Sequence, residues 1–90
     1  MRHSLIKVLK ALSGVQHPIT PKEIQELTGL SKSVTSGCCV ELYDNGYVDR
    51  THLGGRRGYQ YELLPNGATI LKLAEREGNH GDTMRRVQRT

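Results

Sequence analysis

The sequence predicts a mainly α-helical α+β domain in which three helices precede a two-stranded antiparallel hairpin and a fourth helix. Three observations support this fold class: leucines at helical spacing near the start, capping and glycine signals around two short helices, and two alternating segments around a glycine-rich loop. A chain of 90 residues with 36% hydrophobic side chains buries one core. We therefore expect one domain over residues 1–77, followed by a disordered basic tail over residues 78–90.

The first helix is predicted over His3 to Leu12, because its leucines recur at i, i+4 and i+7. The second is predicted over Pro21 to Thr28, where Thr20 and Glu23 form a capping box around a proline in the first turn. Gly29 supplies the left-handed residue that ends this helix. Two apolar residues of the second helix are expected to face the core, Ile24 and Leu27.

The third helix is predicted over Lys32 to Asp44, with Ser31 as its N-cap. Because it follows the second helix after a short glycine-containing turn, the two form a helix-turn-helix. Residues 47–51 and 59–63 then alternate like strands around the loop 52–58, and a fourth helix opens at Pro65 and is expected to end near Gly78. This order is that of the winged helix-turn-helix, with a three-helix core, a two-stranded β-hairpin wing and a C-terminal helix.

Two stretches carry a resemblance to known families. Leu30-Ser31-Lys32-Ser33 and the segment from Leu42 to Arg50 resemble the MarR-type regulators, and the wing from Gly54 to Gly67 resembles that of PadR and MarR proteins. The resemblance covers Pro21 to roughly Glu75. It implies a small transcriptional regulator that binds double-stranded DNA, with the recognition helix 31–44 in the major groove and the wing 52–58 on the minor groove or the backbone.

The candidate reading face lies near the start of the third helix, on the side away from Cys38 and Leu42. A helix fits the major groove, and residues near its N-terminus reach base edges. The face has no arginine or asparagine, so we expect modest base specificity that is partly indirect. Val34 is included through the family resemblance, and burial is the equally weighted alternative for a valine. The residues of this face are Ser31, Lys32, Ser33, Val34, Ser36 and Gly37.

The wing carries the clearest basic signal, since three arginines and no acidic residue lie between Arg50 and Tyr61. Arg56 and Arg57 occupy a glycine-flanked tip, where they can contact phosphates or enter the minor groove; a solvated turn is the alternative. Strand tyrosines such as Tyr59 more often pack against helices than stack on bases. Further candidate contacts to the DNA backbone are Thr20, Lys22, Arg50, Tyr59, Arg85 and Arg86.

The sequence argues against an enzyme, a metal site and a cofactor. No phosphate-binding loop or nucleophile elbow is present, and the four histidines are scattered, so we assign no catalytic or metal-ligating residues. Adjacent Cys38 and Cys39 do not suit a disulfide framework, so we expect reduced thiols with Cys38 in the core; a thiol switch on the recognition helix is the alternative. No apolar run is long enough for a membrane span, which predicts a cytoplasmic protein.

The formal net charge of +4 favours an acidic partner, and double-stranded DNA is the one we expect. A homodimer is the favoured form because regulators that read palindromes are commonly symmetric. No pattern of residues in the sequence indicates a binding site for a small-molecule effector, so an effector is not assigned. The alternative function is a winged-helix protein–protein interaction module in a replication, secretion or polymerase assembly, which the small side chains of the reading face would suit.

Overall fold

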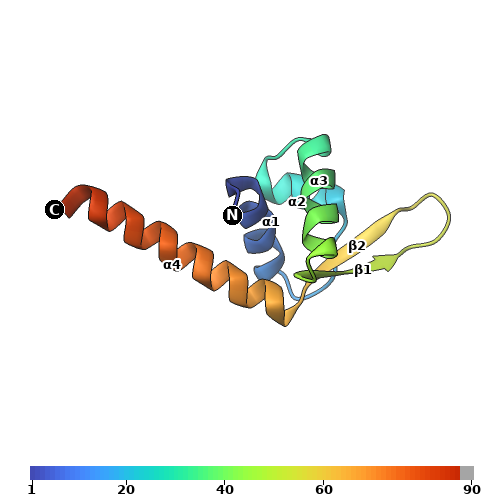
Figure 1. Cartoon of the computed structure of the whole chain (residues 1–90). Coiled ribbons are helices and arrows are strands. Elements are labelled where there is room, and N and C mark those ends of the chain that lie inside the picture. Colours follow the sequence, from blue (N-terminus) through green and yellow to red (C-terminus); the bar gives the residue numbers. More distant parts are fainter. Residues whose placement is uncertain (88–90) are drawn as a thin grey trace.

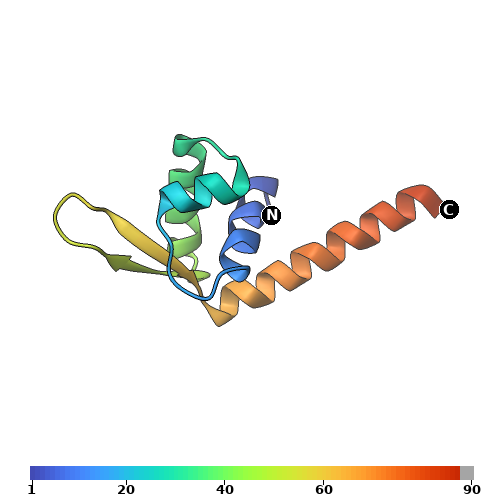
Figure 2. The ribbon, with the colours of Figure 1, turned by 180° about the vertical axis from the view of Figure 1, so that it is seen from behind.

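The computed structural model describes the backbone of residues 1–87 and the side chains of residues 1–77. In Figure 1 the first three helices form the body of the molecule, the hairpin projects on one side and the last helix on the other; Figure 2 shows the same arrangement from behind. This architecture confirms the predicted winged helix-turn-helix. The elements follow in the order α1 (His3–Ser13), α2 (Pro21–Thr28), α3 (Lys32–Asp44), β1 (Val48–His52), β2 (Tyr59–Leu63) and α4 (Pro65–Val87).

The core lies where α1, α2 and α3 meet the hairpin and the start of α4. The leucine stripe predicted for α1 faces it, and α2 contributes Ile24. The prediction that Leu27 also faces inward is wrong, because its side chain is 58% exposed. α2 packs against α1, α3 and β2 with Ile24 buried. Leu27, three positions later, lies about 60° around the helix axis from Ile24 and stays exposed. The core residues are Leu5, Val8, Leu9, Leu12, Ile19, Ile24, Cys38, Cys39, Leu42, Val48, Tyr61 and Leu71.

The predicted capping box is present at the start of α2. The Glu23 backbone N–H donates to the Thr20 hydroxyl at 3.3 Å, and the Thr20 backbone N–H donates to the Glu23 carboxylate at 2.9 Å. These hydrogen bonds lower the pKa of Glu23 below its ordinary value of 4.5, because the Thr20 backbone and hydroxyl favour the charged carboxylate. Gly29 ends the helix with φ +75°, the left-handed conformation that its position predicts.

The capping box predicts a stabilisation that is lost in acid. The folded-state pKa of Glu23 is depressed, so its charge stabilises the fold above pH 4.5, and this contribution disappears as the pH falls through the folded-state pKa. Urea denaturation should show a difference in unfolding free energy between wild type and Glu23→Gln that is constant near neutral pH and shrinks below pH 4.5. Glu26→Gln removes a charge from the same helix outside the cap and serves as the control. A Glu23→Gln difference that persists unchanged in acid would contradict the prediction.

Within the described residues, Thr35 of α3 is a buried polar side chain whose hydroxyl has no hydrogen-bond partner. An unpaired buried hydroxyl lowers stability, so Thr35→Val, which keeps the shape, should raise the free energy of unfolding by about 1 kcal/mol. Thr35→Ser keeps the hydroxyl but removes a buried methyl group, and should lower that free energy by about 1 kcal/mol. Chemical denaturation of the three proteins tests this order. A valine variant less stable than wild type would show that the hydroxyl is satisfied.

The hairpin pairs β1 and β2 antiparallel, with Val48 opposite Leu63 and His52 opposite Tyr59. β1 therefore starts and ends one residue later than predicted, because the Tyr47 N–H donates to the Leu42 carbonyl at 3.0 Å and closes the end of α3 instead. On the other edge of β2, Ile19 and Tyr61 exchange backbone hydrogen bonds of 3.0 and 2.8 Å. The connector before α2 thus anchors the base of the wing.

α4 packs on α1 through buried Leu71 and through an ion pair of 3.3 Å between Lys10 and Glu75. The predicted helix end near Gly78 is wrong, since α4 continues to Val87. An interior glycine costs a helix only about 1 kcal/mol relative to alanine, which does not by itself end a helix. The side chains of residues 78–90 and the placement of residues 88–90 lie outside the described part, so the domain limit at residue 77 and the disordered tail stay predictions.

Candidate nucleic-acid interface

All six residues of the predicted reading face are exposed on α3. The opposite side of the helix is buried through Thr35, Cys38, Cys39 and Leu42. Val34 is 42% exposed, so of its two alternatives the structure supports exposure. The Ser31 hydroxyl accepts the Val34 backbone N–H at 3.3 Å, which makes it the predicted N-cap and orients the first turn of the helix.

Two further exposed residues extend this face toward the end of α3. Val40 is 48% exposed and Tyr43 is 37% exposed. The sequence reasoning missed them because it considered only the first half of the helix. A signal was present, since Ser33, Ser36, Val40 and Tyr43 recur at i, i+3, i+7 and i+10, the spacing of one helix face.

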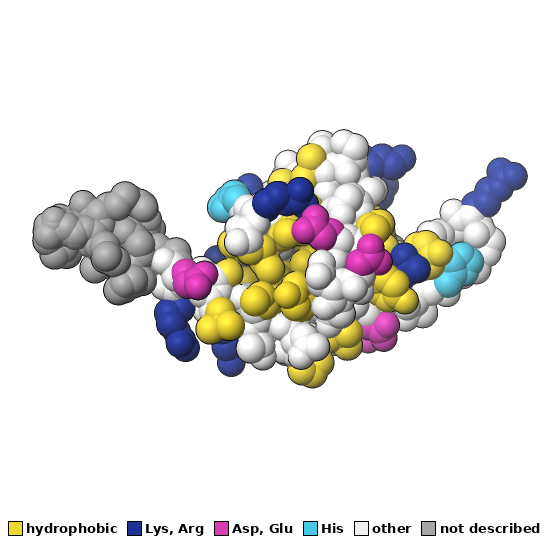
Figure 3. All heavy atoms as spheres, in the orientation of Figure 1, with side chains coloured by type: hydrophobic (Ala, Val, Ile, Leu, Met, Phe, Trp, Pro, Cys, Tyr) yellow, Lys and Arg dark blue, Asp and Glu magenta, His cyan; other side chains and the backbone are white. Residues whose placement is uncertain are grey.

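The tip of the wing is an ordered turn. The Leu53 N–H donates to the Gly58 carbonyl at 2.8 Å, and the Arg57 N–H donates to the Gly54 carbonyl at 3.1 Å. Gly54 and Gly58 have φ values of +92° and +83°, which other residues rarely adopt. Arg56 and Arg57 are exposed on this turn. In Figure 3 basic atoms project at the far end of the hairpin, so the positive charge of the wing faces solvent.

Arg50 connects the wing to α3. Its guanidinium carbon lies 4.1 Å from the centre of the Tyr43 ring and 4.4 Å from that of the Tyr59 ring, within cation–π distance of both. The outer face of α3 therefore continues into the hairpin without a break. Tyr59 remains 36% exposed, whereas Tyr61 is buried in the core. The expectation that strand tyrosines pack inside the protein therefore holds for Tyr61 and not for Tyr59.

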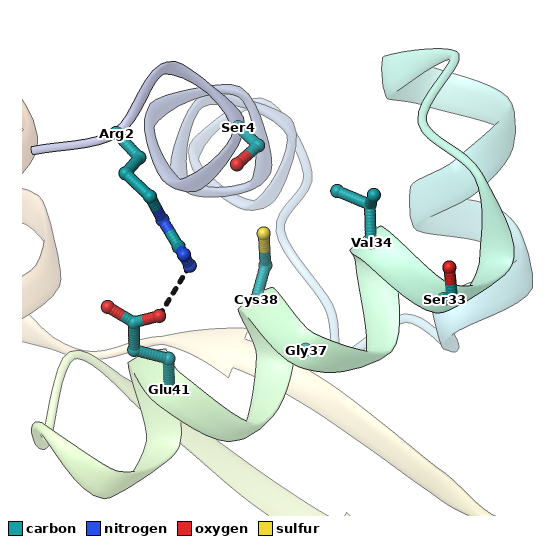
Figure 4. Close-up of a pocket in the computed structure, with 7 residues that line it drawn as sticks. All are labelled: Arg2, Ser4, Ser33, Val34, Gly37, Cys38 and Glu41. Carbon is teal, nitrogen blue, oxygen red and sulfur yellow. Dashed lines mark hydrogen bonds and ion pairs between the residues drawn. The ribbon is translucent and has the colours of Figure 1, made fainter.

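A hollow of about 380 Å³ borders the reading face, between the start of α1 and α3 (Figure 4). Ser33, Val34 and Gly37 belong both to the reading face and to the wall of the hollow. Arg2 reaches across it from the N-cap of α1 and forms an ion pair with Glu41. This ion pair is exposed, and it joins the start of α1 to α3 beside the reading face.

The sequence matches the IclR helix-turn-helix domain over residues 5–52, which is more than half of the chain. The chain belongs to the IclR helix-turn-helix domain family. The match runs from α1 to the end of β1 and includes both helices of the helix-turn-helix. The family consists of DNA-binding domains and is not enzymatic, in agreement with the sequence prediction. No curated protein sequence matches the chain significantly.

Solved structures of transcriptional regulators share the fold of this IclR-type domain. A MarR-family regulator from Rhodococcus sp. RHA1 superposes with a TM-score of 0.76 at 23% identity, over 93% of this chain and 61% of that one. BpsR of Bordetella bronchiseptica, studied for the regulation of its DNA binding by 6-hydroxynicotinic acid, gives a TM-score of 0.75 at 19% identity over the same shares. The chain thus spans about three fifths of the length of these two proteins. The predicted likeness to MarR-type regulators is confirmed for the fold.

A third similar structure contains DNA. TubR from Bacillus thuringiensis serovar israelensis pBtoxis, bound to 24 bp of tubC, gives a TM-score of 0.67 at 25% identity. The superposition covers 82% of this chain and 81% of TubR. The winged fold of this IclR-type domain is therefore shared with a protein that was solved on a DNA duplex.

The other candidate backbone contacts of the IclR-type domain are spread over α2, the wing and α4. Thr20 is half-buried and its hydroxyl takes part in the capping box with Glu23, whereas Lys22 is exposed in the first turn of α2. Arg85 and Arg86 lie on α4, and their side chains are outside the described part. The structure thus brings together the α3 face, Arg50 and the wing, and Thr20 lies apart from them in the capping box of α2.

The cysteines of α3 are both free and buried. Burial, with a smaller effect of the neighbouring Cys38, raises the pKa of Cys39 to about 12, which keeps this thiol protonated and argues against a switch there. No group of three or more His, Cys, Asp or Glu residues suited to a metal ion occurs in the part of the chain that the structure describes. Over the same residues, no helix combines the length and the apolar character needed to cross a membrane.

Proposed function

We propose that this chain binds double-stranded DNA in a sequence-dependent manner, as a small transcriptional regulator. In this proposal α3 enters the major groove with Ser31, Lys32, Ser33, Val34, Ser36 and Gly37, while Arg56 and Arg57 of the wing contact the minor groove or the phosphate backbone. We assign Lys22 and Arg50 as contacts to the DNA backbone, together with Thr20, Tyr59, Arg85 and Arg86. The protein acts in the cytoplasm, where its DNA would be.

The observation that carries this proposal is the continuity of the surface from α3 to the wing. Tyr43 at the end of the exposed α3 face contacts Arg50, and Arg50 contacts Tyr59 of the wing. Between Arg50 and Tyr61 this surface holds three arginines and no acidic side chain. A helix whose first turn carries Lys32 and small polar side chains, beside a basic hairpin, suits one groove and the phosphates that flank it.

The relatives support the same function. TubR was solved on a DNA duplex, and the regulation of DNA binding was studied for BpsR. Both proteins have the winged fold seen here, and the IclR helix-turn-helix domain that matches this chain is a DNA-binding type.

A gel-shift titration against random-sequence duplex at low and moderate salt tests DNA binding, and selection of bound sequences from a random pool tests sequence dependence. We expect a shift at low salt that weakens steeply as salt increases, because phosphate contacts release counterions. Selection should enrich a defined sequence. Absence of a shift at low salt would overturn the proposal, and enrichment of no sequence would reduce it to non-specific binding.

We also propose that the regulator is a homodimer, with α1 and α4 as the elements that supply the interface. A symmetric dimer would read two half-sites about 10 bp apart, one helical turn of DNA. Sedimentation of the purified protein gives its mass in solution, and the selected sequences give the half-site spacing. A monomer in solution together with an unrepeated selected site would contradict the dimer.

The second candidate function is a protein–protein interaction module. It is favoured by one observation: the exposed α3 face presents Val34 and Val40 and no arginine or asparagine for a bidentate base contact. Under this alternative the gel shift would fail at low salt, so the same titration separates the two functions.

A further inference from the structure

The outer face of α3 has an unusual chemical character for a helix that enters the major groove. Val34 and Val40 are 42% and 48% exposed, although valine is most often buried. The exposed positions between them include Ser36 and Gly37, and neither carries a long polar side chain. The two valines are therefore the largest side chains in the middle of this face, and neither can form a hydrogen bond.

The backbone of α3 can come close to a partner between the two valines. An added Cβ at Gly37 would meet no atom within 4 Å, so this position is open to the outside. Val34 and Val40 are six positions apart, which places them roughly 9 Å from each other along the helix axis and about 120° apart around it, on either side of Gly37. That distance corresponds to about two to three base-pair steps of duplex DNA.

The major groove offers one kind of apolar group to such side chains. The edges of its base pairs carry hydrogen-bond donors and acceptors, and the C5-methyl group of thymine is the exception. 5-Methylcytosine carries a methyl group at the same ring position. We propose that Val34 and Val40 read pyrimidine C5-methyl groups, so that α3 selects duplex DNA by thymine in unmodified sequences. This inference rests on the proposed function and adds the chemical group that α3 recognises.

Four duplexes of equal length test the proposal without knowledge of the natural site. They are alternating A·T, the same duplex with deoxyuridine in place of thymidine, alternating G·C, and the same duplex with 5-methylcytosine. Each pair differs in the C5-methyl group, while the phosphates and the minor groove that the wing would contact keep the same chemical groups. We expect tighter binding to the methyl-bearing member of each pair, by about fourfold for each methyl group that a valine covers.

Val34→Ala/Val40→Ala is the decisive variant. Both side chains are exposed, so the fold should remain, and its thermal unfolding is measured to confirm this. The variant should bind all four duplexes with the affinity of wild type for the methyl-free ones. Leu73→Ala, which shortens another exposed apolar side chain on α4, should retain the methyl preference.

Two results would overturn the inference while leaving DNA binding intact. One is equal wild-type affinity within each pair; the other is a methyl preference that the double variant retains, because the preference would then come from the shape of the duplex. If wild type binds none of the duplexes at low salt, the proposed function fails and the inference fails with it.

Discussion

Replacing Gly67 with alanine is expected to lower the free energy of unfolding by about 3 kcal/mol or more, because the added methyl group has no space. Its Cβ would lie 2.1 Å from the Tyr47 carbonyl oxygen and 2.7 Å from Cδ1 of Leu63. The Tyr47 carbonyl also accepts the Leu64 N–H at 3.1 Å, so moving it away would break the hydrogen bond that holds the start of α4. Thermal unfolding followed by circular dichroism should show a midpoint lower by roughly 10–25 °C.

Gly37→Ala is the matched control for Gly67→Ala. It adds the same methyl group in a helix, at a position where the Cβ meets nothing within 4 Å. Alanine is the better helix former, so this variant should be more stable than wild type by up to about 1 kcal/mol. Wild-type stability of Gly67→Ala would show that α4 can shift away from Tyr47, and would contradict the close packing at this position.

Neutralising both wing arginines, as Arg56→Gln/Arg57→Gln, is expected to weaken DNA binding by about tenfold for each arginine, the effect of one charge-assisted hydrogen bond. The weakening should be similar for all DNA sequences, because phosphate contacts position the protein and do not read bases. The slope of log affinity against log salt should become shallower by up to about 0.9 for each phosphate that the variant no longer binds. Fluorescence anisotropy with random-sequence duplex over a series of salt concentrations measures both quantities.

Lys72→Gln/Arg76→Gln controls for the removal of positive charge. Both residues are exposed on α4, and neither is among the proposed DNA contacts, which on this helix are Arg85 and Arg86. This variant should keep an affinity and a salt slope close to those of wild type. A wing variant that also keeps the wild-type affinity and salt slope would remove the wing from the DNA interface.

The elements of the fold follow from local signals. The Thr20–Glu23 capping box, the left-handed Gly29 and the Ser31 cap depend on residues within one helical turn of each other, and the structure contains all three. The winged order of these elements therefore follows from the sequence. The errors concern Leu27, the limits of β1 and the end of α4. Periodicity does not show which neighbour covers a helix face, the Tyr47 N–H is used by the end of α3, and one glycine does not end a helix.

In the candidate site, too, some residues could be predicted from local sequence and others could not. The residues near the start of α3 and the two arginines of the wing could be named from residue type and position, and the structure exposes all of them. Arg50 could be named as a candidate backbone contact, but its position between Tyr43 and Tyr59 could not be predicted, because it depends on the approach of the hairpin to the end of α3. Tyr59 and Tyr61 share one strand face, yet Tyr61, whose backbone pairs with Ile19, is buried in the core, whereas Tyr59 remains exposed beside Arg50.

The sequence by itself determined the order and type of the elements and the location of the basic charge, because caps, turns and periodicity act between neighbours in the chain. Only the tertiary structure decided that the α3 face and the wing form one surface. That surface depends on contacts between different elements, those of Arg50 on β1 with Tyr43 on α3 and with Tyr59 on β2. Such contacts form only when the whole core packs, and local pattern therefore does not contain them.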